Sequence, residues 1–233
     1  IKELNFKEEY FLDNSFSIQT IPFQYLDSMC LIKLNDIKIL NLNDCDIKSE
    51  KQLKIIKNLC GSIDLLLVQF SYAIGKSNYD DGRLRKELAR SILNKLSDNI
   101  KFLNPKVVIP FASFCYFSNY NNFYLNDSIN KIEHTIDFLK KRNPNIIFKC
   151  FYPGDVWDLK NDWDNELVIK KYNCDYKKIK PKIKNIQQFN YNDLLKISKK
   201  FINTTKKNNS LFYFYNIFNK KFHKIYFKLT DLN

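Results

Sequence analysis

Apolar positions in the first 160 residues follow the spacing of β-strands and of helices in turn. Residues 16–21 and the stretches SMCLIKL and KILNL have strand-like patterns, and the short Asn35-Asp36 turn between these two stretches predicts a β-hairpin. Three later runs, IDLLLVQF, KVVIPF and IIFKCFY, are mostly apolar throughout, which is typical of strands buried on both faces. We therefore expect a sheet with a buried centre.

Helical spacing separates these strands. Residues 49–59 begin with Ser-Glu and end before Gly61, and residues 129–141 carry apolar side chains on one side. The longest predicted helix, 81–102, repeats a large aliphatic residue every fourth position: Leu84, Leu88, Ile92, Leu96 and Ile100. Helices that alternate with buried strands predict an α/β fold in which helices pack on a sheet.

The pattern changes after about residue 160. A polar, basic stretch is followed by an amphipathic helix at 190–206 and by two strand-like runs, LFYFYNIF and FHKIYFKL. We therefore predict an α/β domain over residues 1–160 and a small basic α+β appendage over residues 161–233.

Composition excludes several classes of protein. Apolar residues make up 45% of the chain, so a large core is expected, and only four glycines occur, with no GxGxxG or Walker A pattern. No apolar run approaches the roughly 18 to 20 residues that span a bilayer, and the first residues do not form a signal peptide. We expect a soluble, cytoplasmic protein without a membrane partner. Because the chain begins with Ile1 and not with Met, either an initiator has been lost or the sequence is a fragment, and we expect a fragment.

The charge of +13 permits two interpretations. A basic protein can bind nucleic acid. However, lysine, asparagine, isoleucine, phenylalanine and tyrosine are all abundant together, as expected of an AT-rich genome, and this bias raises the charge without forming a binding face. The lysines gather late in the chain, so a solvated basic tail is the simpler interpretation.

The stretch LNLNDC contains the first candidate site. An apolar strand runs directly into Asn43, Asp44, Cys45 and Asp46. A carboxylate at a strand end is a hard oxygen ligand, so Asp44 could bind a metal ion. The alternative is that Asn43 and Asp44 form an Asx-turn that closes the strand.

Two further strand ends carry candidate binding residues. In PFASFCYFS, hydroxyl groups such as that of Ser113 alternate with aromatic rings such as Tyr116, and could line a pocket, or the rings could simply be core. In FYPGD, a Pro-Gly turn leads to Asp155, and such a turn needs no function. The two histidines, His134 and His223, suggest no catalytic triad, and the six cysteines contain no CxxC, so no zinc finger is predicted.

Taken together, DSMCLIKLNDIKILNLNDC, IDLLLVQFS, LNPKVVIPFASF and FYPGD resemble, in this order, the second half of metallo-β-lactamase-fold proteins. The form with PFASF and PGD is similar to the branch that includes CMP-N-acetylneuraminate hydroxylase. The resemblance covers about residues 15 to 160. It implies an αββα sandwich with a metal site at the sheet edge.

In this resemblance Asp44 would be the metal-bridging carboxylate, with Asp27 and Ser28 nearby. The substrate would lie against Asp27, Ser28, Asn43, Ser113, Tyr116 and Asp155. The metal would be zinc, iron or manganese in the complete protein, and this chain alone could hold none. The HxHxDH motif of the fold is absent, because no histidine precedes residue 134.

Three functions follow as hypotheses. The first is a metal-dependent hydrolase- or hydroxylase-like protein that acts on a nucleotide-linked or amino sugar, with catalytic residues that the sequence does not identify. The second is a non-catalytic binding protein of the same fold that uses the PFASFCYFS pocket. The third is a nucleic-acid-processing protein, which would bind with a steep salt dependence.

Overall fold

The computed structural model describes residues 4–6, 8–24, 27–72, 77–112, 114–182 and 190–208. The chain divides into two compact units, residues 1–183 and residues 184–233. The domain boundary predicted after residue 160 lies inside the first unit.

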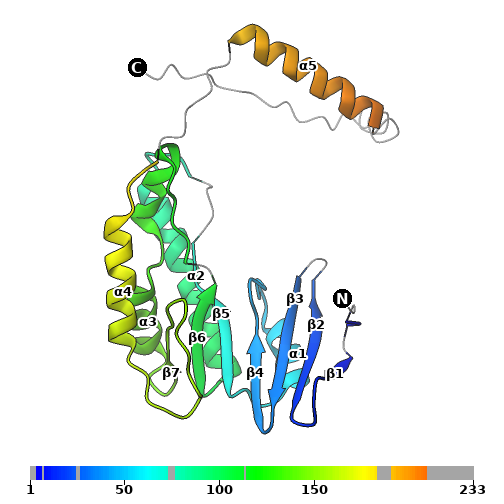
Figure 1. The fold of residues 1–233 in the computed structure, drawn as a ribbon, viewed down its shortest axis with the longest axis vertical. Coiled ribbons are helices and arrows are strands. Elements are labelled where there is room, and N and C mark those ends of the chain that lie inside the picture. Colours follow the sequence, from blue (N-terminus) through cyan, green and yellow to red (C-terminus); the bar gives the residue numbers. More distant parts are fainter. Residues whose placement is uncertain are drawn as a thin grey trace. The chain divides into compact units, whose positions relative to one another are not determined.

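Over the residues that the structure describes, the first unit is built on one mixed sheet of seven strands. In spatial order they are β1 (Glu9–Phe11), β2 (Phe16–Phe23), β3 (Asp27–Leu34), β4 (Ile37–Asn41), β5 (Leu65–Gln69), β6 (Val107–Ala112) and β7 (Ile147–Phe148). The strands β1 to β4 pair antiparallel, and β4 to β7 pair parallel (Figure 1). Figure 1 shows that the sequence order of the strands is also their order across the sheet.

The predicted hairpin is confirmed. Strands β3 and β4 pair up to Leu34 and Ile37, so Asn35 and Asp36 alone form the turn. Asn35 has a φ of 52°, in the left-handed region that asparagine tolerates better than most residues.

The three predicted helices of this unit are also confirmed. They are α1 (Glu50–Cys60), α2 (Gly82–Leu103) and α3 (Ile132–Arg142). Helix α1 begins with a capping box, in which the Ser49 hydroxyl accepts from the backbone N–H of Gln52 while the Gln52 side chain accepts from the backbone N–H of Ser49. It ends at Gly61, whose φ of 68° favours glycine.

Three elements were not predicted: strand β1, the 3-10 helix η1 (Tyr120–Ser128) and helix α4 (Asn165–Lys178). Asp164 caps α4 by accepting from two backbone N–H groups, and only Val168 and Tyr172 of this helix are buried. An apolar stripe this narrow is easily missed in a lysine-rich sequence.

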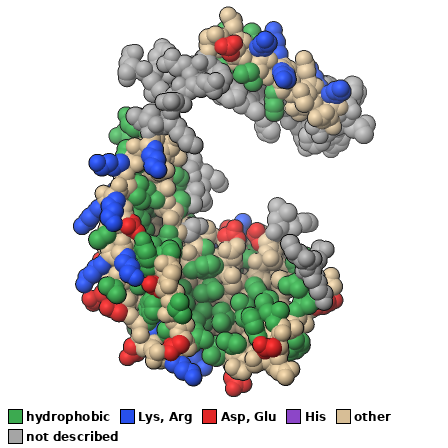
Figure 2. Space-filling model, viewed as in Figure 1, with side chains coloured by type: hydrophobic (Ala, Val, Ile, Leu, Met, Phe, Trp, Pro, Cys, Tyr) green, Lys and Arg blue, Asp and Glu red, His purple; other side chains and the backbone are tan. Residues whose placement is uncertain are grey.

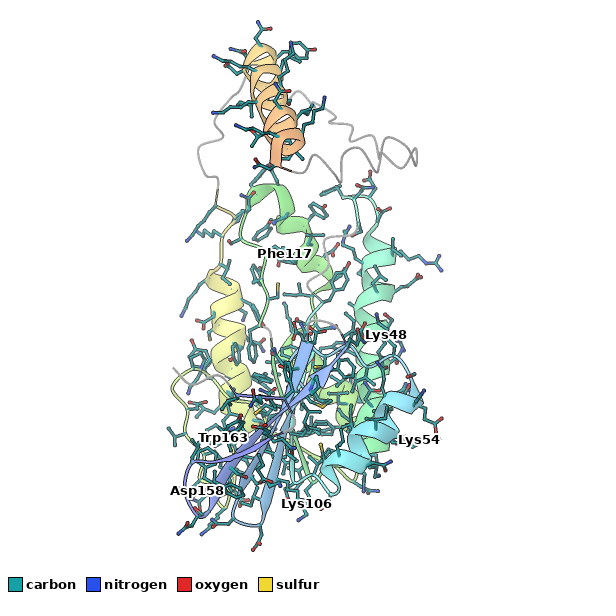
Figure 3. All side chains as sticks on the ribbon, turned by 90° about the vertical axis from the view of Figure 1, so that its right-hand side faces the viewer. Lys48, Lys54, Lys106, Phe117, Asp158 and Trp163 are labelled. Carbon is teal, nitrogen blue, oxygen red and sulfur yellow. The ribbon has the colours of Figure 1, made fainter. Side chains whose placement is uncertain are left out.

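The two faces of the sheet differ. On one face, paired residues of successive strands form a buried row: Leu31, Leu40, Leu66, Val108 and Phe148. Helices α1 and α2 lie on the same side of the sheet (Figures 1 and 3). Residues of α1 and α2 belong to the core cluster that contains this row, so this is the covered face.

The neighbouring residues point to the opposite face and also form a paired row: Tyr10, Ile18, Ile32, Ile39, Leu65, Val107 and Ile147. Apart from the buried Leu65, the members of this row are half-buried or, in the case of Ile147, 56% exposed. Figure 2 shows apolar side chains gathered over the sheet on the side away from α1 and α2. We call this the open face.

The second unit is described over one helix, α5 (Tyr191–Asn208). It confirms the helix predicted at 190–206. The runs LFYFYNIF and FHKIYFKL, predicted to form a hairpin, lie outside the described residues. Among the described residues, no helix is long and apolar enough to cross a membrane.

Candidate functional site

The carboxyl ends of β4 and β5 and the first residue of β3 meet at one edge of the sheet. Because β3 runs antiparallel to β4, with Cys30 opposite Asn41, Asp27 lies beyond the end of β4. Burial raises the pKa of the Cys45 thiol to about 11, and the negative charges of Asp27 and Asp44 act in the same direction. The fold therefore brings Asp27 and Asp44 close enough to Cys45 for their charges to raise the pKa of its thiol.

Asp44 lies in a tight, exposed turn. The Asn41 side chain accepts a hydrogen bond of 2.8 Å from the backbone N–H of Asn43, and Asn43 has a φ of 46°. The Asn43 amide in turn donates to the Asp44 carboxylate at 2.9 Å. An Asx-turn therefore closes the strand, but its side chain comes from Asn41 and not from Asn43 or Asp44, as our alternative interpretation had it.

A cavity of about 400 Å³ opens beside this turn, and we call it the strand-end pocket. It lies between the 42–47 loop, the end of β5 and one side of α2. Its polar lining residues are Asn43, Asp44, Asp46, Gln69, Ser71, Ser91, Lys95 and Asn99. This volume is within the range of small-molecule sites, and the carboxyl ends of parallel strands are the usual place for such sites in α/β proteins.

The apolar repeat that we predicted in α2 contributes to this pocket rather than only to the core. Leu88 and Ile92 are half-buried and line the strand-end pocket, and Leu84 is 44% exposed. The buried stripe of α2 begins with Arg85 and Ala89, each one residue after a member of the predicted repeat, and it includes the last two members of that repeat.

One ion-pair network crosses the rim of the pocket. Lys95 of α2 contacts the Asp46 carboxylate at 2.9 Å, and Lys48 contacts it at 3.5 Å. The hydrogen bond from Lys95 lowers the pKa of Asp46. Among described residues the salt bridges at this rim involve Asp46 and not Asp44, whose carboxylate accepts from the neutral Asn43 amide.

The described residues do not fit a metal ion by themselves. Within 4–6, 8–24, 27–72, 77–112, 114–182 and 190–208, no three His, Cys, Asp or Glu side chains form a group that could hold one. His134 is exposed on α3 and lies against Phe138, and it lines a different cavity from Asp44. His223 lies outside the described residues.

The other predicted substrate-binding residues are dispersed. Ser28 is exposed and pairs with Pro22 across β2 and β3, and Ser113 lies outside the described residues. Asp155 closes its own turn by accepting from the backbone N–H of Tyr152 at 2.8 Å, and it pairs with Lys171 of α4 at 3.1 Å. The first of these contacts lowers the pKa of Asp155.

Tyr116 lies in an aromatic layer away from the strand-end pocket. Its ring lies 5.6 Å from the ring of Tyr176, and the two lie near a separate cavity of about 600 Å³ that Tyr116 lines with Asp175 and Lys178. In the same segment Phe114 stacks on Tyr172 at 4.3 Å and contacts Phe70. Phe114 therefore packs against the core.

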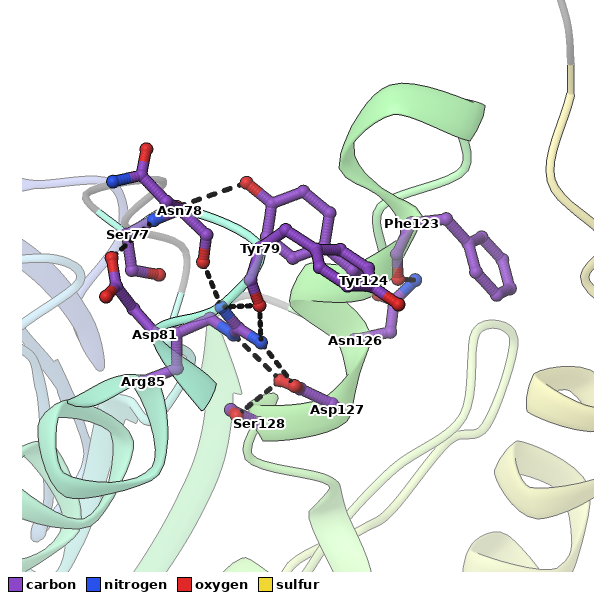
Figure 4. Close-up of polar contacts among 10 residues, drawn as sticks. All are labelled: Ser77, Asn78, Tyr79, Asp81, Arg85, Phe123, Tyr124, Asn126, Asp127 and Ser128. Carbon is purple, nitrogen blue, oxygen red and sulfur yellow. Dashed lines mark hydrogen bonds and ion pairs between the residues drawn. The ribbon is translucent and has the colours of Figure 1, made fainter. Parts of the chain in front are cut away.

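The structure also contains a buried polar cluster that the sequence analysis missed. Arg85 is 2% exposed, and its guanidinium donates to the Asp127 carboxylate and to the carbonyls of Asn78 and Tyr79 (Figure 4). It also lies over the Tyr124 ring at 5.0 Å. The sequence did contain one signal for this residue, because the chain has only four arginines and Arg85 is one of them.

This cluster joins three segments rather than forming a catalytic centre. Arg85 from α2 holds the 78–79 loop by its carbonyls and η1 by Asp127, and the Tyr124 hydroxyl donates to the Ser77 carbonyl at 3.1 Å. Each of the three guanidinium nitrogens of Arg85, Nε, Nη1 and Nη2, donates to at least one acceptor. These hydrogen bonds satisfy the buried charge of Arg85 and so stabilise the 78–79 loop.

No protein-family model matches the sequence, and no curated protein sequence matches it. Among solved structures, CmlA, a diiron β-hydroxylase from Streptomyces venezuelae, is similar with a TM-score of 0.43 and 13% identity, over 65% of this chain and 33% of that chain. A mutant of the CmlA β-hydroxylase gives a TM-score of 0.42 and 12% identity, over 65% of this chain and 32% of that chain. The chain thus spans about a third of these proteins, and a likeness at this level assigns neither a function nor a site residue.

Proposed function

We propose that the first unit binds a small polar molecule in the strand-end pocket, with Asp44 as the principal recognition group. The observation that carries this proposal is the position of the Asp44 carboxylate, which lines a cavity of about 400 Å³ while its neighbour Asp46 is engaged by lysines. An exposed carboxylate beside amides and hydroxyls suits a ligand with several hydroxyl or amino groups.

The ligand class that we favour is a nucleotide-linked or amino sugar. Asp44 and Asn99 offer acceptors for sugar hydroxyl or amino groups, and Leu88 and Ile92 offer apolar contact. Lys95 would bind a phosphate only by leaving Asp46, so recognition of the sugar is expected to dominate.

We further propose that the open face belongs to a two-layered αββα sandwich, as the resemblance to metallo-β-lactamase-fold proteins implies. The support is the row of half-buried aliphatic side chains across the sheet, which a second layer would remove from water. In that arrangement the protein would be a metal-dependent hydrolase- or hydroxylase-like enzyme. Asp44 would supply one ligand, and zinc, iron or manganese would need further ligands from outside the described residues.

A non-catalytic binding protein of the same fold is the second candidate. It is favoured by the lack of a group of three potential metal ligands among the residues that the structure describes. Ligand binding at the strand-end pocket is common to both candidates, so only their dependence on metal separates them.

The test compares the purified full chain with Asp44→Asn and with the control Asp36→Asn. Asp36 is an exposed aspartate in the β3–β4 turn, at the opposite end of β4 from Asp44. We expect calorimetry to detect binding of CMP-N-acetylneuraminate or glucosamine, and Asp44→Asn to weaken it roughly tenfold to a hundredfold through loss of charged hydrogen bonds. Asp36→Asn should bind as the wild type does.

Elemental analysis of the same three proteins, after exposure to Zn²⁺, Fe²⁺ or Mn²⁺, separates the two candidates. A stoichiometric metal that Asp44→Asn loses would support the enzyme. Sugar binding by metal-free protein would support the non-catalytic candidate. If the wild type binds neither sugar, or if both variants lose binding equally, the strand-end pocket is not the site.

A further inference from the structure

Helix α5 has an apolar face and a lysine-rich face, and neither face is buried. Its apolar residues are exposed, including Tyr191 at 68%, Ile197 at 53% and Phe201 at 69%. No residue of this helix is buried. An 18-residue helix whose apolar side chains face water is costly unless another surface covers them.

Helical spacing separates the residues of α5 into two arcs. At about 100° per residue, one arc collects the aromatic and aliphatic residues Tyr191, Leu194, Leu195, Ile197, Phe201 and Ile202. The other arc contains all five lysines of the helix: Lys196, Lys199, Lys200, Lys206 and Lys207. The only acidic residue is Asp193, in the first turn.

These two arcs restrict the partner. A second apolar protein surface would cover the aliphatic arc and leave the lysines unused. A nucleic acid would neutralise the lysines and leave Phe201 and Ile202 in water. An anionic lipid surface satisfies both arcs, because the apolar side chains enter the boundary between headgroups and acyl chains while the lysines remain among the anionic headgroups.

We propose that α5 binds in the plane of an anionic membrane surface. The helix carries too many lysines to cross a bilayer, in agreement with the absence of a spanning helix among the described residues. The proposal is independent of the strand-end pocket. It replaces our expectation of no membrane partner with a peripheral contact.

The experiment is cosedimentation of the full chain with vesicles of phosphatidylcholine, with or without phosphatidylserine. We expect binding only when phosphatidylserine is present, and weaker binding as salt rises. Circular dichroism in the presence of the same vesicles should show that helicity is retained or increased.

Three variants separate the contributions. Phe201→Ser with Ile202→Ser should abolish most binding because it removes the aromatic and aliphatic anchors. Lys199→Gln with Lys200→Gln should weaken binding roughly 25-fold, from about fivefold for each lysine near the surface. The control Lys51→Gln with Lys54→Gln removes the same charge from exposed positions of α1 and should bind as the wild type does.

Other results would overturn the proposal. Equal binding to vesicles without phosphatidylserine, or equal loss of binding in the α1 control, would exclude specific recognition of anionic lipid by α5. Self-association that only the Phe201 and Ile202 variant loses, without vesicle binding, would identify a second copy of the chain as the occupant. Tighter binding to duplex DNA that only the Lys199 and Lys200 variant loses would identify a nucleic acid.

Discussion

Two charged residues, Asp44 at the end of a strand and Arg85 in the buried stripe of α2, lie in opposite surroundings, since Asp44 is exposed and Arg85 is buried. The sequence alone identified Asp44 as a candidate because a carboxylate directly follows an apolar strand, and the structure places it on a small-molecule-sized cavity. For Arg85 the sequence offered only the rarity of arginine as a signal, and its burial was not predicted because an arginine in a helical repeat usually faces water. Its burial depends on Asp127, which is distant in sequence and reaches it only in the folded chain.

Replacement of Arg85 by methionine should destabilise the first unit. The variant would leave the carbonyls of Asn78 and Tyr79 and the Asp127 carboxylate without their donor. We expect the free energy of unfolding to fall by about 2–3 kcal/mol, since hydrogen bonds to charged groups contribute about 1.5–3 kcal/mol and Asp127 remains partly hydrated. Urea denaturation measures this change.

The matched control is Arg83→Met on the same helix. Arg83 is exposed and its ion pair with Glu87 spans one turn of α2, so its loss should cost less than about 1 kcal/mol. Equal effects of the two substitutions would mean that Arg85 does not hold the loop and η1 together.

At the scale of secondary structure, the sequence predicted elements well where local signals and burial agreed. The opening Ser-Glu of α1 and the two-residue turn at Asn35 are local signals in adjacent residues, and the helix and the turn both formed as expected. Helix α4 and strand β1 were missed because their stability comes from tertiary contacts. Val168 and Tyr172 pack on the core, and β1 is held by pairing with β2.

The capping box makes a separate prediction for α1. Ser49→Ala should lower the free energy of unfolding by about 1 kcal/mol, because the backbone N–H of Gln52 loses its acceptor. The control Ser62→Ala changes an exposed serine just beyond the same helix and should have little effect. Thermal unfolding of both variants checks this, and a larger effect at Ser62 would contradict the cap.

At the scale of the whole first unit, the main feature is a sheet with one open face and one face covered by helices, whose core cluster includes residues of α1, α2 and α3. The alternation of strands and helices predicted an α/β fold, but it could not say which face each helix would cover. A continuously apolar strand such as IDLLLVQF also predicts burial on both faces. Leu65 and Leu66 of β5 point to opposite faces, and both are buried. In the neighbouring strand β4, Leu40 is buried on the covered face, but Ile39 on the open face is only half-buried.

Two adjacent residues of β4 test this difference between the faces. Leu40 is fully buried on the covered face, so Leu40→Ala should cost about 2–5 kcal/mol of unfolding free energy. Ile39 is half-buried on the open face, so Ile39→Ala should cost about 1 kcal/mol. Chemical denaturation compares them directly, and equal losses would mean that another layer covers the open face in solution.

The lengths of the outermost strands have a consequence for how this sheet can associate. A long edge strand presents a row of unpaired backbone groups that recruits further strands. Here the outer strands are β1 and β7, with three and two residues, so each offers few such groups. Growth of the sheet by addition of strands is therefore disfavoured at both edges. A partner for this unit would instead be selected by the shape and side chains of a surface, which is a more specific mode of recognition than backbone pairing.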